Sequence, residues 1–175
     1  MEDPSSQALL LQFLLLVILT FLNAFFSAAE MAMVSLNRAR VEQKAEEGDK
    51  KYIRLLQILE SPNNFLSTIQ VGITLINILS GASFADTLGR VFASWMGNSE
   101  TAHAVASFLS LALLTYVSIV FGELYPKRIA LNLKDNLAVR SAPFIIFLGK
   151  LVSPFVWLLS ASTNLLSRIT PMKFD

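Results

Sequence analysis

The sequence places an acid and a helix breaker together at the end of an apolar run. In the segment "IVFGELYPKRIA", residues 119–130, Glu123 ends the apolar run and Pro126 follows three positions later. A proline inside a helix has no N–H for the carbonyl four residues earlier, and its ring pushes against that carbonyl. Here the carbonyl belongs to Gly122. The spacing therefore predicts a helix kink that leaves a main-chain oxygen without its partner, beside a carboxylate.

Polar residues also recur at helical spacing inside two other apolar segments. Asn23, Ser27 and Glu30 are four and three residues apart, which puts them within about 60° of one another on one helix face. A second stripe consists of Gln70, Thr74, Asn77 and Gly81, with Ser80 at its flank. The Gly122 carbonyl, the Glu123 carboxylate, the Asn77 amide and the Ser27 hydroxyl would form an all-oxygen set, which suits hard cations such as Mg²⁺.

Each of these residues also has a purely structural explanation. Glu123 could pair with Lys127 or Arg128, which follow it closely in the chain. Asparagine and serine commonly form hydrogen bonds between membrane helices, so the stripes could serve only helix association. The Gly122 and Pro126 pair could mark no more than a helix end. An ion site is favoured because each of the three apolar segments has a helix face with oxygen-bearing groups. Acids lie among them, and acids inside membrane spans are functional candidates by default.

The composition requires a membrane around these residues. The chain of 175 residues is 54% hydrophobic and only 15% charged, which is too apolar for an ordinary soluble domain. We expect an all-α membrane protein with three transmembrane helices, a helical hairpin and an amphipathic juxtamembrane belt. Because about 20 apolar helical residues cross the hydrocarbon core, the spans are predicted at about residues 8–34, 63–90 and 102–126. The solvated hairpin covers residues 36–60 and is predicted to break near Gly48.

The basic residues predict the orientation of the spans. Lysine and arginine concentrate in the hairpin and after residue 126, whereas the N-terminus and the loop 96–103 have none. By the positive-inside rule the N-terminus lies outside and the C-terminus lies in the cytosol. We therefore expect a multi-pass protein of the cell (plasma) membrane, in contact with the lipid bilayer.

The segment 137–175 follows the three-span bundle predicted for residues 1–136. Its apolar part, 137–170, is long enough to be counted as a fourth span. However, two prolines interrupt it, and Lys150 lies near its middle, where a lysine at the bilayer centre costs about 2.5–3.5 kcal/mol on insertion scales. We favour a broken amphipathic belt at the cytoplasmic interface, with a fourth span as the alternative.

Several classes of function do not fit the sequence. The absence of cysteine excludes disulfides and thiolate chemistry, and a single histidine excludes a multi-histidine metal site within the chain. We expect no enzyme activity, because the one histidine, His103, falls in the outer loop, far along the chain from Ser27. We also expect no nucleic-acid binding, since the basic residues flank spans and are explained by topology.

Three motifs give the sequence a resemblance to a known family. "NAFFSAAEMA" in the first span, "GITLINILSGA" in the second and "GELYPKRIA" at the end of the third resemble the transmembrane domain of the CorB/CorC and CNNM (cyclin M) magnesium transport proteins. The resemblance covers nearly the whole chain, and Gly-Glu-Leu-x-Pro-Lys is its most specific part. It implies a homodimer of three-span domains, followed by a cytosolic pair of CBS domains that would start where this chain stops, near Asp175.

The resemblance also implies a function and a ligand set. The function is that of a divalent cation (Mg²⁺) transporter, a Na⁺-coupled Mg²⁺ exporter that holds the ion with oxygen ligands between the spans. The alternative is a non-transporting membrane anchor or Mg²⁺ sensor for the cytosolic CBS domains. Carried over by motif, the metal ligands are Ser27, Asn77, the Gly122 carbonyl and the Glu123 carboxylate, with Asn23, Glu30 and Ser80 as further candidates and Pro126 as the structural kink.

Overall fold

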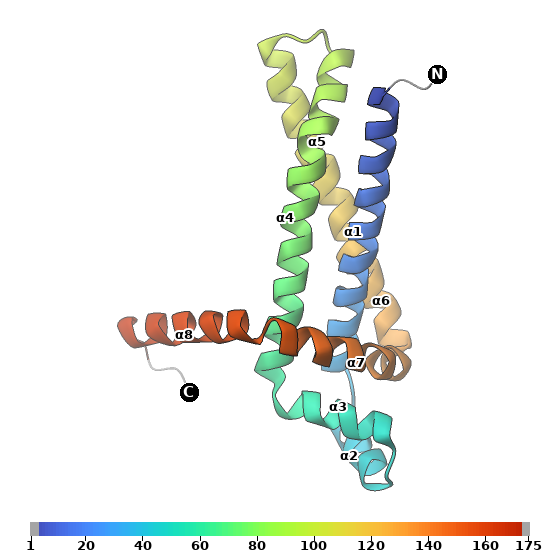
Figure 1. Ribbon diagram of the computed structural model, residues 1–175, viewed down its shortest axis with the longest axis vertical. Helices are drawn as coiled ribbons and strands as arrows, with labels where there is room; N and C mark the ends of the chain where they lie inside the picture. Colours follow the sequence, from blue (N-terminus) through green and yellow to red (C-terminus); the bar gives the residue numbers. More distant parts are fainter. Residues whose placement is uncertain (1–3, 173–175) are drawn as a thin grey trace. The chain divides into compact units, whose positions relative to one another are not determined.

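The computed structural model describes residues 4–172, and these residues form helices joined by short turns (Figure 1). The chain divides into two compact units. Unit 1 contains Met1–Ser35 and Val71–Lys134, and unit 2 contains Leu36–Gln70 and Asp135–Asp175. The predicted ion-binding residues all belong to unit 1, whereas the predicted hairpin and belt belong to unit 2.

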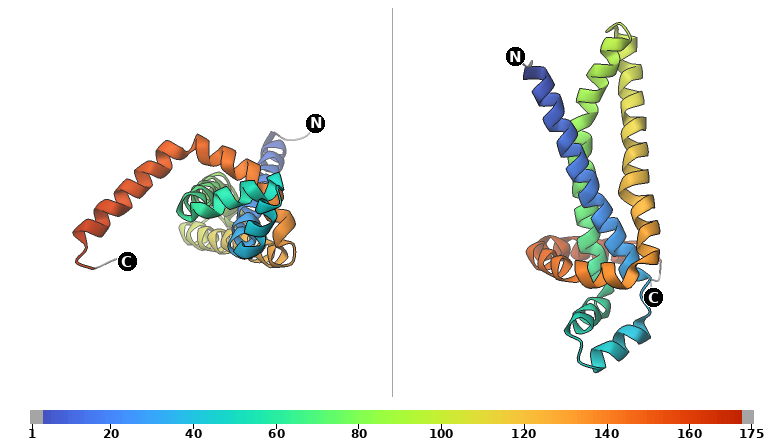
Figure 2. Two further views of the ribbon diagram at one scale, coloured as in Figure 1. Left: turned by 90° about the horizontal axis from the view of Figure 1, so that it is seen from below. Right: turned by 90° about the vertical axis from the view of Figure 1, so that its right-hand side faces the viewer.

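Unit 1 is built from long helices that lie side by side (Figure 2). They are α1 (Pro4–Val34), the part of α4 (Pro62–Trp95) that starts at Val71, and a continuous run of α5 (Glu100–Ile119), the π-helical turn η1 (Val120–Leu124) and α6 (Tyr125–Asn132). The α4 and α5 helices are joined by a tight turn in which Gly97 and Asn98 have positive φ angles of 97° and 59°. Ser99 then caps α5 by accepting a hydrogen bond from the Ala102 N–H at 3.0 Å.

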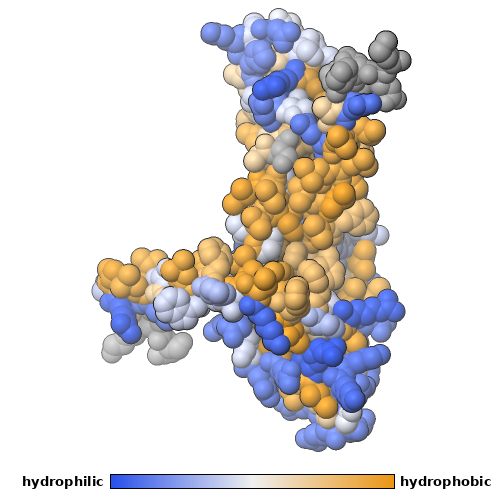
Figure 3. Space-filling view, in the orientation of Figure 1, coloured by the Kyte–Doolittle hydropathy of each residue, from blue (hydrophilic) through white to orange (hydrophobic). Residues whose placement is uncertain are grey.

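Three helical segments among the described residues are long and apolar enough to cross a membrane. They are Gln7–Val34, Pro62–Trp95 and Glu100–Asn132, which confirms the three predicted spans. In the face shown in Figure 3, hydrophobic residues cover the middle of these helices. The second and third of these helical segments are longer than the predicted spans, whose bounds within the membrane stay predictions. At 1.5 Å per residue, 34 residues measure about 51 Å, so α4 is longer than the hydrocarbon core of roughly 30 Å.

Unit 2 contains the predicted hairpin, formed by α2 (Arg38–Glu46) and α3 (Lys50–Glu60). Gly48 has a φ of 93°, a left-handed conformation that glycine adopts without steric penalty, so the break falls where it was predicted. Asp49 caps α3 by accepting a hydrogen bond from the Lys51 N–H at 3.1 Å. Lys44 ties the two helices together, because its Nζ donates to the Tyr52 hydroxyl at 3.2 Å and lies 4.5 Å from the centre of that ring.

The rest of unit 2 consists of the first turns of α4 and of the helices α7 (Lys134–Leu151) and α8 (Ser153–Ile169). The α7 and α8 helices meet at Val152 with a bend of 72°. An ion pair between Arg40 and Asp135, at 3.1 Å, connects the hairpin to α7. The length and hydropathy of the pair fit a broken span as well as two separate helices. The interfacial position of the belt therefore stays a prediction.

Candidate functional site

Three side-chain oxygens of α1, those of Gln12, Asn23 and Ser27, are buried without a hydrogen-bond partner among the described residues, and those of Asn23 and Ser27 are one helical turn apart. The side chains of Asn23 and Ser27 are 2% and 0% exposed, yet neither Asn23 Oδ1 nor Ser27 Oγ has a partner among the described residues. These two residues therefore share a helix face. Leaving a buried polar group unpaired costs about 1–3 kcal/mol. Two such oxygens together form a ready acceptor set for an electropositive group.

The π-helical turn η1 interrupts the third span directly before Pro126. The Tyr125 N–H donates to the Val120 carbonyl, five residues back. In a regular α-helix that N–H would bond the Phe121 carbonyl, and residue 126 would bond the Gly122 carbonyl. The N–H of residue 126 would bond the Gly122 carbonyl in an α-helix and the Phe121 carbonyl in a π-helix. Pro126 has no N–H, so it donates to neither. The Phe121 carbonyl therefore loses both helical donors, and the Gly122 carbonyl loses its α-helical one.

The Asn23 side chain of α1 and the irregular turn lie next to each other. The α1 helix packs against η1 and α6. Gly122 is buried, and a Cβ atom added there would lie only 2.5 Å from Asn23 Nδ2. The absence of a side chain at Gly122 is thus what allows the Asn23 amide to reach the backbone of the π-helical turn.

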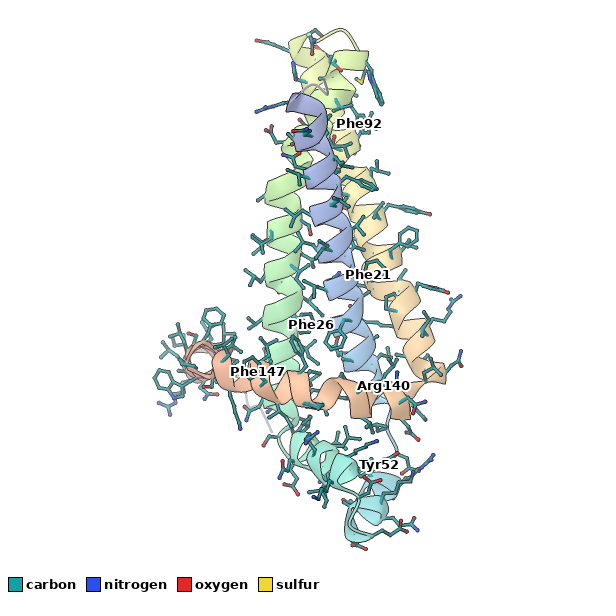
Figure 4. All side chains as sticks on the ribbon, turned by 45° about the vertical axis from the view of Figure 1, so that its right-hand side comes forward. Phe21, Phe26, Tyr52, Phe92, Arg140 and Phe147 are labelled. Atoms are coloured by element: carbon teal, nitrogen blue, oxygen red, sulfur yellow. The ribbon has the colours of Figure 1, made fainter. Side chains whose placement is uncertain are left out.

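On another side of α1, Phe26 packs against α4. Figure 4 labels this side chain, which extends from the lower half of α1. A Cβ added to Gly72 would lie 2.9 Å from Phe26 Cζ, so the ring rests directly on the α4 backbone. Phe26 and the neighbouring Ser27 are both buried. Close packing on both sides of α1 therefore shields the oxygens of Asn23 and Ser27 from solvent.

Two acids lie near these oxygens along the chain. Glu123 follows Gly122 in η1, and Glu30 follows Ser27 by three residues on the same face of α1; both are partly buried. Neither acid forms an ion pair with any residue that the structure describes, including Lys127 and Arg128. The simple pairing of Glu123 with its downstream bases is therefore not present.

The described residues contain no group of three or more His, Cys, Asp or Glu side chains that could hold a metal ion. Neutral oxygens of the main chain, amides and hydroxyls would therefore have to supply part of any ion site in this region. Such oxygens are normal ligands for hard cations, alongside carboxylates and water.

The predicted residues of α4 are divided between its buried and exposed faces. Ile73, Ile76 and Ser80 are buried and share one face, whereas Asn77 is exposed. At 100° per residue, Asn77 lies about 70° from the centre of the buried face. The structure thus brings Asn23 against Gly122, with Ser27 one turn along α1 and Glu123 adjacent in the chain, and it leaves Asn77 at an exposed edge. The ligand roles of Asn77 and Ser80 remain predictions.

Sequence reasoning missed the Phe121 carbonyl and ranked Asn23 below Ser27. The sequence shows that Pro126 has no N–H to donate. Only the structure shows that the Tyr125 N–H, the α-helical donor to the Phe121 carbonyl, bonds the Val120 carbonyl instead. Likewise, the spacing of Asn23 indicates its helix face, whereas its contact with Gly122 depends on how α1 packs on η1. No signal in the sequence alone identifies either feature.

Comparison with known proteins matches almost the whole chain to one family. The family described as "Cyclin M transmembrane N-terminal domain" matches residues 14–174. The UPF0053 protein sll0260 of Synechocystis is 39% identical over 168 residues, which cover 94% of this chain and 38% of that protein. The UPF0053 inner membrane protein YfjD of Escherichia coli is 32% identical over 88% of this chain and 34% of its own length.

A further relative has a name that indicates its substrate. The "Polyamine export protein" of Haemophilus influenzae is 27% identical over 165 residues, covering 89% of this chain and 37% of that protein. The chain therefore spans little more than a third of the length of these curated relatives.

Proposed function

Since the chain belongs to the family of cyclin M transmembrane domains, we propose that this multi-pass membrane protein transports a divalent cation, Mg²⁺, by binding it between its spans. The observation that carries the proposal is a pair of buried oxygens, Asn23 Oδ1 and Ser27 Oγ, that have no hydrogen-bond partner among the described residues and lie on the helix whose Asn23 amide contacts the glycine of a π-helical turn. A cation satisfies such acceptors where protein donors are missing, and this compensates for the penalty of leaving them unpaired.

The proposed ligand set extends the predicted one. Ser27, Asn77, the Gly122 carbonyl and the Glu123 carboxylate supply the predicted oxygens. The structure adds Asn23 as a main candidate, because its amide oxygen is buried and unpaired. The Phe121 carbonyl joins it, because its helical donors are absent. Glu30 and Ser80 are further candidate ligands. Mg²⁺ commonly keeps several of its waters, so not all of these oxygens need to bind at once.

We propose that the protein exports Mg²⁺ and that the entry of Na⁺ drives this export. A site built largely from neutral oxygens suits both a divalent and a monovalent hard cation. Exchange of the two ions at one site would then couple their movements, provided that the site opens to one side of the membrane at a time. We further propose a homodimer with the N-terminus outside and cytosolic CBS domains following this segment, as in the family that it resembles.

The experiment that tests the proposal replaces the acid of the π-helical turn. The purified protein is reconstituted in liposomes, and Mg²⁺ flux is followed with an indicator dye. We expect Glu123→Ala to abolish the flux, because it removes the carboxylate from the ligand set. Glu100→Ala is the matched control, since Glu100 is an exposed acid in the first turn of α5. Unimpaired flux in Glu123→Ala, with Glu100→Ala also active, would remove the central residue from the mechanism.

A second candidate substrate is a polyamine, which the name of the Haemophilus relative favours. The ammonium groups of a polyamine are hydrogen-bond donors, so they too would satisfy the buried oxygens of Asn23 and Ser27. Liposomes loaded with spermidine in place of Mg²⁺ separate the two substrates. A non-transporting anchor or sensor would give no flux of either solute, although Mg²⁺ would still bind.

A further inference from the structure

Unit 2 contains a groove of about 850 Å³. Its two sides are the end of α3 with the first turns of α4, and the α7–α8 bend. At one point the sides approach closely, since a Cβ added to Gly149 of α7 would lie 3.4 Å from Thr68 Oγ1 of α4. The volume falls in the range typical of clefts that hold small organic ligands.

The walls of the groove are largely apolar. Phe65, Ile145 and Val156 are buried and form part of the wall. Trp157 also lines the groove, and 71% of its surface is exposed. Trp side chains commonly lie at the membrane–water interface, where the ring contacts acyl chains and the N–H contacts polar groups.

The groove has a positive charge at one side and no acid in its lining. Lys150 is the one charged residue among those that line it, and it forms no ion pair with any described residue. On α3, Arg54 precedes the lining residues Gln57 and Ile58 by three and four positions, so it lies on the same helix face, one turn from the groove. Arg54 also has no ion pair within residues 4–172.

The surroundings of the groove fit a lipid environment. Part of its wall comes from the first turns of α4, where a candidate membrane span begins. Along α8, large apolar side chains are exposed, and Figure 3 shows hydrophobic residues along one edge of this helix and more polar ones along the other. The Ser162 and Thr163 hydroxyls donate to main-chain carbonyls of their own helix, at 2.8 and 2.9 Å.

From these observations we propose that the groove binds an anionic phospholipid. The headgroup phosphate binds Lys150, Arg54 lies at the rim, and an acyl chain follows the wall formed by Phe65, Ile145 and Trp157. The charge is complementary, because a lone cation faces no acid across the groove. Serine hydroxyls at Ser61 and Ser160 offer further donors to the headgroup. The inference uses no residue of the proposed ion site and is independent of it.

The test measures lipid binding to the protein purified in a mild detergent. Phosphatidylglycerol, phosphatidylcholine and glycerol phosphate are each titrated while the thermal unfolding midpoint and the lipid-bound mass are followed. We expect phosphatidylglycerol to bind and to raise the midpoint, phosphatidylcholine to bind more weakly, and glycerol phosphate to have no effect. Removing one lysine charge near a membrane surface should weaken binding about fivefold, so we expect Lys150→Gln to do so.

A matched control distinguishes the groove from general attraction of charge. Arg168 is an exposed base in the last turn of α8 that does not line the groove. We expect Arg168→Gln to bind phosphatidylglycerol as the unchanged protein does, and Ser160→Trp, which fills the groove, to lose binding while both cations remain. Equal weakening by Arg168→Gln, no preference over phosphatidylcholine, or saturation by glycerol phosphate alone would each overturn the proposal.

Discussion

Replacement of Gly122 with alanine tests the contact between α1 and the π-helical turn. The added Cβ would lie 2.5 Å from Asn23 Nδ2 and 3.4 Å from its Cγ, so the Asn23 amide must move. Because Asn23 is only 2% exposed, its side chain has little room to rotate without displacing its neighbours. We therefore expect Gly122→Ala both to destabilise unit 1 and to shift one of the proposed ligand oxygens.

The magnitude follows from comparison with Gly81→Ala. A Cβ at Gly81 would meet no atom of the described residues within 4 Å, so that variant should gain only the helix preference of alanine, about 0.5–1 kcal/mol. In Gly122→Ala the helix preference raises the free energy of unfolding by a similar amount, and overpacking lowers it by about 1–3 kcal/mol. The helix preference cancels in the comparison. The free energies of unfolding of the two variants should thus differ by about 1–3 kcal/mol.

The assay is denaturant unfolding of the reconstituted protein, combined with Mg²⁺ flux. We expect Gly122→Ala to be less stable than Gly81→Ala and to lose flux. Adding Asn23→Ala to Gly122→Ala should restore stability, because it removes the atoms that clash, but it should not restore flux. If Gly122→Ala matches Gly81→Ala in both stability and flux, the contact between Asn23 and the π-helical turn is not what the structure indicates.

Three further predictions test the packing and the site. Ser27→Ala removes a buried hydroxyl that has no partner among the described residues, so we expect the free energy of unfolding to stay unchanged or to rise by up to about 1–3 kcal/mol. We also expect Mg²⁺ to raise the unfolding midpoint of this variant less than that of the unchanged protein. A large loss of stability would show that the hydroxyl is paired. Gly72→Ala places a Cβ 2.9 Å from Phe26 Cζ, so its unfolding free energy should fall by about 1–3 kcal/mol, and Phe26→Leu in the same chain should recover part of it. Asp135→Asn breaks the ion pair with Arg40; the Asp135 side chain is 29% exposed and the Arg40 side chain 55%. The free energy of unfolding, measured with denaturant, should fall by less than about 1 kcal/mol, and by less still at 1 M salt.

The sequence by itself determined the helical class, the three spans and the hairpin, because these depend on local patterns. Apolar length predicts a span, and Gly48 allows the left-handed turn that separates α2 from α3. Pro126 likewise predicted a disturbed helix from covalent chemistry alone, since proline has no N–H. The helices that contain the second and third spans are longer than the predicted spans, and which of their residues lie within the membrane stays a prediction.

The tertiary structure decided which of the oxygen-bearing residues lie together. Spacing places Asn23 and Ser27 on one face, but it does not indicate what that face packs against. Only the packing of α1 on η1 buries both oxygens and brings Asn23 against Gly122. The same packing leaves Asn77 exposed, although its stripe has the same spacing. Burial depends on neighbours that are distant in sequence, so a helical period alone does not determine it.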